Sequence, residues 1–270
     1  MSESSLTANP GTQGLPAEHK NFPNIPTISA EGEIIDGGVT GLVCLQDDGT
    51  VIKYSWPEQE ECEEEMAQEA HAYRRLFELF GHHPRFVKFL SHDQHAHTIT
   101  MEYMPNGTLR SYLRDHHESI SKKQRFRWIA ALAEGLELLH SANIVHCDFS
   151  TKNLLLDHDL ELKVADFGCS SLDGGRTNGG GSARFYPPRE WRTGRIEAAD
   201  DLFALGSCIF EILTGRPPYD DLETRRVGRL YGLRQFPDLV GMDFADVIRD
   251  CWLFRGQSAR EVHHRLLEAL

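Results

Sequence analysis

Residues 144–168 read IVHCDFSTKNLLLDHDLELKVADFG. The apolar runs at 144–145, 154–156 and 162–165 have the length and residue types of short β-strands, and the polar residues 157–159 are typical of a turn. The stretch therefore predicts a loop after the first strand and a tight hairpin between the second and the third.

Three polar residues lie where these predicted strands begin or end. Asp148 is on the loop after the first strand, Asn153 precedes the second strand, and Asp166 follows the third. Two carboxylates and an amide that converge from loop ends supply oxygen ligands for a hard cation and leave one carboxylate free. Magnesium-assisted phosphoryl transfer uses such a set, because it needs ligands for the ion and a base that orients a hydroxyl group.

The pattern H-x-D-x-x-x-x-N at 146–153, followed by D-F-G at 166–168, resembles the catalytic and metal-binding loops of eukaryotic protein kinases. The resemblance implies that Asp148 accepts or orients the proton of a substrate hydroxyl, and that Lys152 reaches the γ-phosphate of ATP. It also implies that Asn153 and Asp166 hold Mg²⁺.

Two positions in the same loop depart from the kinase pattern. Cys147 stands where many relatives carry the arginine that clamps a phosphorylated activation loop, and Ser150 stands where serine/threonine kinases carry lysine. A basic residue at Lys152 is more typical of tyrosine kinases, so the type of acceptor residue stays open. Because the arginine is missing, we predict that phosphorylation of Thr177 or Ser182 is not required for activity.

Residues 33–54 alternate as three strands, of which the first two are joined by a glycine-rich turn. By resemblance, Gly38, Gly41 and Val43 match the kinase glycine-rich loop, whose backbone approaches the phosphates of ATP closely. Asp36 occupies the first glycine position of that loop, which places a negative charge near a polyanion.

Lys53 lies on the third of these strands, in the sequence TVIKY, and resembles the kinase lysine that grips the phosphates. Apolar residues at helical spacing predict a long acidic helix over 57–80. The motif E-x-x-x-Y-x-x-L, which starts at Glu69, resembles the kinase regulatory helix, so we expect Glu69 to pair with Lys53. Glu65 is the alternative partner.

Two further strands are predicted over residues 86–90 and 98–103, followed by a Pro-Asn-Gly turn. This segment resembles the hinge between the kinase lobes. The resemblance implies that adenine forms hydrogen bonds with the backbone of Glu102 and Met104, and that Met101 guards the back of the pocket.

The block DLFALGSCIFEILTGRPPY, which starts at Asp201, reads as a buried helix stopped by Gly215. It resembles the central helix of the kinase C-lobe, whose leading aspartate would accept hydrogen bonds from the catalytic-loop backbone. Residues 187–190 match the family's A-P-E motif loosely. Arg260 is a candidate partner for Glu190.

The predicted fold is α+β and bilobal, like that of protein kinases. A small five-stranded antiparallel sheet with one helix precedes a mostly helical lobe. We expect a flexible tail over residues 1–30, an N-lobe over 31–104 and a C-lobe over 105–270.

Composition narrows the choice of partners. The 270 residues carry a formal net charge of −13, which argues against nucleic-acid and anionic-membrane partners and favours a basic protein substrate. No apolar run approaches the roughly 20 residues of a membrane span.

The six cysteines form no C-x-x-C pair, so we expect reduced thiols and a cytoplasmic or nuclear location. We also expect a monomer. Five histidines lack the spacing of a metal site (82, 83, 92, 95 and 97).

Together these features predict a protein kinase that transfers the γ-phosphoryl group of Mg²⁺-ATP to a serine, threonine or tyrosine hydroxyl of a protein. A pseudokinase that keeps the fold without efficient catalysis is the alternative, favoured by Asp36, Cys147 and Ser150. A small-molecule kinase is a second alternative, which the block at 201–219 disfavours.

Overall fold

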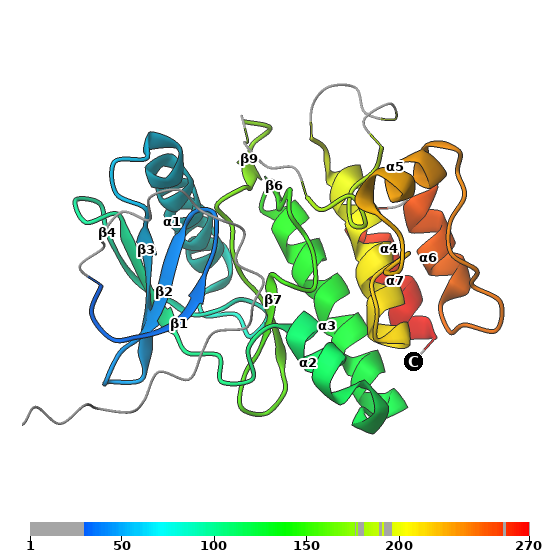
Figure 1. Cartoon of the computed structure of the whole chain (residues 1–270), viewed down its shortest axis with the longest axis horizontal. Coiled ribbons are helices and arrows are strands. Elements are labelled where there is room, and N and C mark those ends of the chain that lie inside the picture. The colour runs from blue at the N-terminus through cyan, green and yellow to red at the C-terminus, as the bar shows by residue number, and fades with distance from the viewer. Residues whose placement is uncertain are drawn as a thin grey trace, which may run out of the picture.

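The computed structural model describes residues 30–175, 177, 181–188, 191, 196–255 and 258–269. Figure 1 shows a β-sheet with one helix at one end of the molecule and a group of helices at the other. Short strands and α3 lie between these two parts. The bilobal α+β fold predicted from the sequence is therefore confirmed.

The N-terminal part is one antiparallel sheet with the strand order β1-β2-β3-β5-β4. Helix α1 contacts β3, β4 and β5. The apolar stripe of α1 faces inward, with Met66, Ala70, Tyr73 and Leu76 all buried. These elements are β1 (Glu33–Gly37), β2 (Gly41–Leu45), β3 (Thr50–Ser55), α1 (Glu60–Phe80), β4 (Phe89–Asp93) and β5 (Thr98–Glu102).

The strand predicted over 86–90 is wrong in its bounds, because β4 begins three residues later. Phe86 instead forms a bridge to Val164. The amide of Val87 donates to the carbonyl oxygen of Val164 at 3.1 Å, and the amide of Val164 donates to that of Arg85 at 2.8 Å. The apolar run at 86–87 thus joins the sheet region to the C-terminal part instead of extending the sheet.

The C-terminal part is mostly helical. Its elements are α2 (Leu109–His116), a 3₁₀ turn η1 (His117–Ser119), α3 (Lys122–Ser141), β6 (Ile144–Val145), β7 (Leu154–Leu156), β8 (Leu162–Val164), β9 (Ser171–Leu172), α4 (Ala198–Thr214), α5 (Thr224–Gly232), α6 (Ala245–Trp252) and α7 (Ala259–Glu268). The hairpin predicted between the second and third short strands is present as β7–β8.

Helix α4 is the centre of this part, and its residues 200–212 are all buried. It packs against α6 so closely that a β-carbon at Gly206 would lie 2.9 Å from the Cβ of Cys251. The indole of Trp252 donates to the Ser207 hydroxyl at 2.9 Å. Because α4 is held on all sides, it provides a rigid support for the loops that it contacts.

Candidate active site

A cavity of about 310 Å³ lies between the sheet and the short strands of the C-terminal part. Every residue that the sequence proposes for the site lines this cavity, with the exception of Asp148. Its volume is within the range of small-molecule sites in proteins. The predicted set in the lining is Gly38, Gly41, Val43, Lys53, Glu69, Glu102, Met104, Lys152, Asn153 and Asp166.

Lys53 is the central cation of the cavity. Its Nζ lies 2.6 Å from Glu69 Oε2 and 2.7 Å from Asp166 Oδ1. Burial opposes the charged form of Lys53, but the two carboxylates outweigh it and raise the pKa of the ammonium group. Burial would also raise the pKa of Asp166, yet the Lys53 charge and hydrogen bond hold it below its ordinary value. The attraction between the Lys53 ammonium group and the two carboxylates therefore holds Lys53, Glu69 and Asp166 together.

Glu69 is the partner of Lys53, and Glu65 is not. The Glu69 side chain is 2% exposed and reaches Lys53 from the inner face of α1. Glu65 lies one turn earlier, and its Oε2 atom is buried without a hydrogen-bond partner. Burial and the nearby Asp166 carboxylate raise the pKa of Glu65.

Asp148 lies outside the cavity but next to it, and Asn153 connects the two. The Asn153 amide donates to the Asp148 backbone oxygen at 2.8 Å and to Asp148 Oδ2 at 3.0 Å. Gly181 also lies close to Asp148, since a β-carbon at Gly181 would lie 3.2 Å from Asp148 Oδ1. Burial raises the pKa of the Asp148 carboxyl, while the His146 ring and the Asn153 hydrogen bond act in the opposite direction.

Asp201 of α4 fixes the backbone of the loop that carries Asp148. Asp201 Oδ2 accepts a hydrogen bond from the His146 amide at 2.7 Å, and Oδ1 accepts one from the Cys147 amide at 3.0 Å. The His140 ring lies 3.1 Å from Asp201 Oδ2. Cys147 has a φ of 67°, a left-handed conformation that side chains rarely adopt, and these bonds hold it there.

A run of aromatic rings joins the sheet to this loop. Phe89 stacks on Tyr73 at 5.5 Å, and Tyr73 meets Phe167 edge-on at 4.8 Å. Phe167 then meets the His146 ring at 5.4 Å between centroids. The position of α1 is thereby linked to that of the loop with Asp148. In the sequence Tyr73 is only the tyrosine of the E-x-x-x-Y-x-x-L motif, which did not indicate this wider role.

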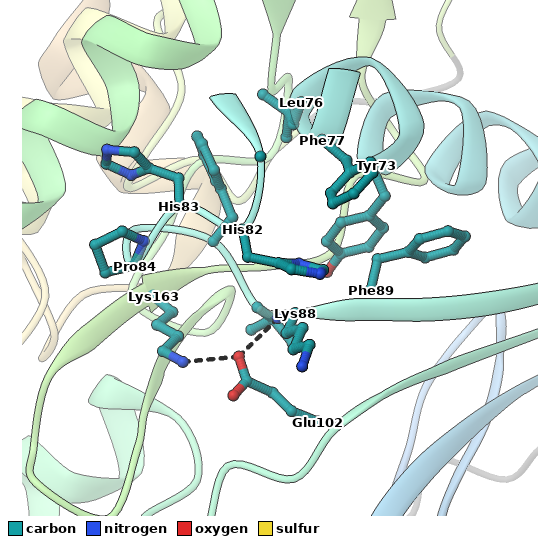
Figure 2. A pocket seen from close by; sticks show the side chains of 13 residues that line it. Tyr73, Leu76, Phe77, His82, His83, Pro84, Lys88, Phe89, Glu102 and Lys163 are labelled. Carbon is teal, nitrogen blue, oxygen red and sulfur yellow. Dashed lines mark hydrogen bonds and ion pairs between the residues drawn. The ribbon is translucent and has the colours of Figure 1, made fainter. Parts of the chain in front are cut away.

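Glu102, in the segment that the sequence predicts as the hinge, forms an ion pair that the sequence did not indicate. Figure 2 shows Lys163 directed at the carboxylate of Glu102. The Lys163 Nζ lies 2.7 Å from Glu102 Oε1. The amide of Lys88 donates to the same carboxylate oxygen at 2.6 Å. These contacts occupy the Glu102 side chain and join β5 to β8, and Glu102 also lines the cavity.

Cys147, which stands where the kinase pattern has an arginine that binds a phosphorylated loop, lies in contact with Thr177. The Thr177 hydroxyl donates to the backbone oxygen of Cys169 and also interacts with the Cys147 thiol. Burial and the Asp201 charge raise the pKa of Cys147, and burial raises that of Cys169 to about 12. The Cys169 thiol is therefore protonated at neutral pH and a poor nucleophile.

Glu190, proposed as a partner for Arg260, lies outside the described residues. Arg260 itself lies 3.9 Å from Glu137. Within the described ranges there is no cluster of three His, Cys, Asp or Glu side chains suited to a metal ion. Magnesium in phosphoryl-transfer sites is usually held by one or two protein oxygens together with substrate phosphates, so Asn153 and Asp166 fit such an ion.

The same cavity fits a nucleotide. Val43, Val51 and Leu155 provide apolar walls, while Lys53 offers the positive charge that triphosphate requires. No atom would contact a β-carbon at Gly38, so the glycine-rich turn leaves open space at the rim. In the part of the chain that the structure describes, no helix combines the length and apolar character needed to cross a membrane.

Comparison with known proteins agrees with this geometry. Residues 30–270 match the family described as protein tyrosine and serine/threonine kinase. The chain is 33% identical over 165 residues to "Probable serine/threonine-protein kinase PBL18" of Arabidopsis thaliana, which covers 58% of this chain and 41% of that protein. It is 28% identical over 205 residues to cytoplasmic tyrosine-protein kinase BMX of Homo sapiens, covering 70% and 29% respectively.

A third relative is dual specificity protein kinase splA of Dictyostelium discoideum, 27% identical over 199 residues, with 63% of this chain and 8% of that protein covered. The matched region is thus less than half of each of these relatives. Because the family match extends over nearly the whole chain and the site geometry agrees with it, this chain belongs to the protein kinase family.

Proposed function

We propose that the chain is an active protein kinase that transfers the γ-phosphoryl group of ATP to a hydroxyl group of a protein. The observation that carries this proposal is the assembled set of Lys53, Glu69 and Asp166, with Asp148 placed next to it by Asn153. Phosphoryl transfer by a protein kinase requires both the lysine–glutamate ion pair and the metal-binding aspartate to be in place.

Each residue has a role in this proposal. Lys53, held by Glu69, positions the α- and β-phosphates, and the backbone of Glu102 and Met104 binds the adenine. Gly38, Gly41 and Val43 close over the phosphates from the turn between β1 and β2. Bound Mg²⁺ would neutralise phosphate charge, and Asp166 and Asn153 are the residues that would hold it.

Asp148 orients the acceptor hydroxyl and takes up its proton. The bond from Asn153 aims the carboxylate, and the Asp201 contacts fix the backbone beneath it. Lys152 is exposed at the edge of the cavity and would contact the γ-phosphate during transfer. The acceptor is serine, threonine or tyrosine, since the chain resembles kinases of both classes.

A pseudokinase is the second candidate, and Asp36 is the observation that favours it. Asp36 lines the cavity, and its carboxylate accepts a hydrogen bond from the Gly37 amide at 2.8 Å. A carboxylate at this rim opposes the binding of triphosphate. The small-molecule kinase is disfavoured, because the chain contains the central helix α4 and the family match includes it.

The remaining expectations concern partners and location. We propose a protein substrate of basic character, because the chain carries a net charge of −13. The described cysteines are all free thiols, which supports a reducing compartment such as the cytoplasm or nucleus. A monomer remains our proposal for the oligomeric state.

A pair of measurements on purified full chain separates the two candidates. First, ATP at about 100 times its Kd should raise the Tm by about 5–10 °C, and only with Mg²⁺ present. Second, γ-labelled ATP should transfer its phosphoryl group to the chain itself or to a generic protein substrate. A Tm increase without any transfer would identify a pseudokinase, and no response in either measurement would exclude nucleotide binding.

A further inference from the structure

Helix α5 carries three arginines on one exposed face. Arg225, Arg226 and Arg229 are exposed, whereas Val227 and Tyr231 are fully buried on the opposite side. At helical spacing the three arginines occupy adjacent positions, since residues three and four apart are neighbours on a helix surface. The outward face of α5 is therefore a compact positive surface on a strongly acidic chain.

These arginines differ from most of the other arginines that the structure describes, which pair with a carboxylate. Within the described residues, none of the three has a carboxylate oxygen within 4.0 Å. Carboxylates are in excess, with 41 against 28 lysines and arginines, so scarcity is not the cause. The described arginines that do pair with a carboxylate are Arg75, Arg85, Arg110, Arg114, Arg127, Arg249, Arg255, Arg260 and Arg265.

Arg229 lies in the last turn of α5, where a positive charge is favourable, but the mutual repulsion of the three arginines opposes the helix. Like charges at these spacings repel one another on a helix. Gly228 and Gly232 also lower the helix propensity of this short element. The helix is held instead by Val227 and Tyr231, which are packed in the core. A surface that works against local stability in this way is expected where a partner binds.

The position of α5 connects it to the candidate active site. The Tyr231 hydroxyl donates to the Arg184 backbone oxygen at 3.4 Å. The Arg184 guanidinium in turn donates to the backbone oxygens of Tyr219, at 3.1 Å, and of Leu222. Arg184 belongs to the same segment as Gly181, which approaches Asp148. Figure 1 shows α5 next to α4, where the Tyr231 ring meets that of Phe203 at 5.3 Å between centroids.

We infer that the exposed face of α5 is a docking surface for an acidic segment of the protein substrate, which rests on the proposed kinase function. Arginine side chains bind carboxylates through paired hydrogen bonds. The acidic segment would bind on α5, separate from the acceptor hydroxyl at Asp148. A basic region elsewhere in the substrate remains compatible with the overall charge.

An acidic protein segment fits this surface better than a nucleic acid does. The three arginines are confined to α5, a helix of nine residues. Three carboxylate side chains, Asp220, Asp221 and Glu223, lie immediately before it. A long polyanion would meet these carboxylates and the net charge of −13, which repel it. A short acidic segment can contact the arginines and avoid the carboxylates.

Fluorescence anisotropy with a labelled oligoglutamate peptide and the full chain tests the proposal. We expect the triple variant Arg225→Glu, Arg226→Glu, Arg229→Glu to bind the peptide about tenfold more weakly or worse. The matched control is Lys123→Glu, Arg249→Glu, Arg260→Glu, which makes the same change in net charge on other helices. This control should bind within about twofold of the wild type, apart from a small general electrostatic effect.

The same measurement on an Asp148→Asn chain should give unchanged peptide binding. Peptide binding is thereby measured in a chain that lacks the proposed catalytic base. A failure of the docking proposal can therefore be distinguished from a failure of the kinase assignment. A second variant with glutamine at the three α5 positions removes the charge without reversing it, and it should also weaken binding. Thermal unfolding of each variant checks that the chain is folded.

Three results would overturn the proposal. The first is no measurable binding of the peptide by the wild type. The second is an equal loss of binding in the α5 variants and in the matched control, which would reflect net charge alone. The third is tighter binding of an oligouridylate than of the peptide, lost in the same α5 variants, which would make the surface a nucleic-acid site.

Discussion

Asp148 is held in a state suited to a proton acceptor. Its carboxylate oxygen Oδ2 accepts a hydrogen bond from Asn153, and the backbone just before it is fixed through the amides of His146 and Cys147. Burial raises the pKa of this carboxyl above the ordinary aspartate value of 3.8. A base whose pKa is closer to neutral pH accepts a proton more readily during transfer.

This shift predicts the acid side of the pH–rate profile. Only the ionised form of Asp148 can accept the proton, so kcat should fall as the pH decreases through the raised pKa. The decrease should therefore begin at a higher pH than an unperturbed aspartate would give. Steady-state rates across the acid range measure it, and a rate that stays constant down to the ordinary aspartate pKa would contradict the assignment.

Thr177 predicts an unusual response to phosphorylation. Its hydroxyl donates to the Cys169 backbone oxygen and contacts the thiol of Cys147, the residue that stands in place of the kinase arginine. The double variant Thr177→Ala, Ser182→Ala should keep kcat within about threefold of the wild type, because only neutral contacts are lost. Thr177→Glu should reduce activity, because it places a charge near Asp201. A double alanine variant without turnover would refute this.

The individual residues show what could be predicted from the sequence. Lys53, Glu69, Asn153 and Asp166 belong to motifs with fixed spacing, so the sequence identified each of them and the structure brings them together. The contact of Thr177 with the catalytic loop could not be predicted. It depends on the path of a glycine-rich segment that has neither periodicity nor a strand or helix pattern.

At the scale of single elements, α4 has two functions. It forms the centre of the C-terminal core, and its first turn supplies Asp201 to the catalytic loop. The sequence predicted both, because the apolar run defines the helix and Asp201 leads it. The bounds of β4 were less predictable: Phe86 and Val87 read as strand residues, but their bonds go to the distant Val164.

The role of Asp201 can be measured by substitution. Asp201→Asn places an amide group against backbone amides that need an acceptor, and at least one buried donor loses its partner. We expect a loss of about 2–3 kcal/mol in the free energy of unfolding, together with reduced kcat. Asp246→Asn on α6 is the control, since its side chain is 83% exposed, and it should cost less than about 0.5 kcal/mol. Similar losses in denaturant titrations of both variants would show that Asp201 has no special role.

At the scale of the whole molecule, the aromatic rings connect the two parts of the fold. Tyr73 on α1 is 2% exposed and contacts both Phe89 in the sheet and Phe167 next to Asp166. Movement of α1 would therefore displace the rings and separate Glu69 from Lys53. The structure shows the arrangement in which all these contacts are made.

Tyr73 variants test this connection. Tyr73→Phe keeps the ring, so stability and kcat should change little. Tyr73→Ala removes a buried aromatic ring, which should cost about 3–5 kcal/mol in the free energy of unfolding and lower kcat/KM through the displaced Glu69. Chemical denaturation and steady-state kinetics of the two variants provide the comparison. Equal kinetics for both variants, with folded protein in each case, would show that the rings do not couple α1 to the site.

The central claim is that this arrangement of residues catalyses phosphoryl transfer, and Asp148→Asn tests it most directly. The substitution keeps the size of the side chain and leaves Lys53, Glu69 and Asp166 in place. We predict that ATP binding, measured by the Mg²⁺-dependent increase in Tm, is retained, and that transfer from γ-labelled ATP falls by a factor of about 10² or more. Transfer by the Asp148→Asn chain at the rate of the wild type would contradict the role given to Asp148.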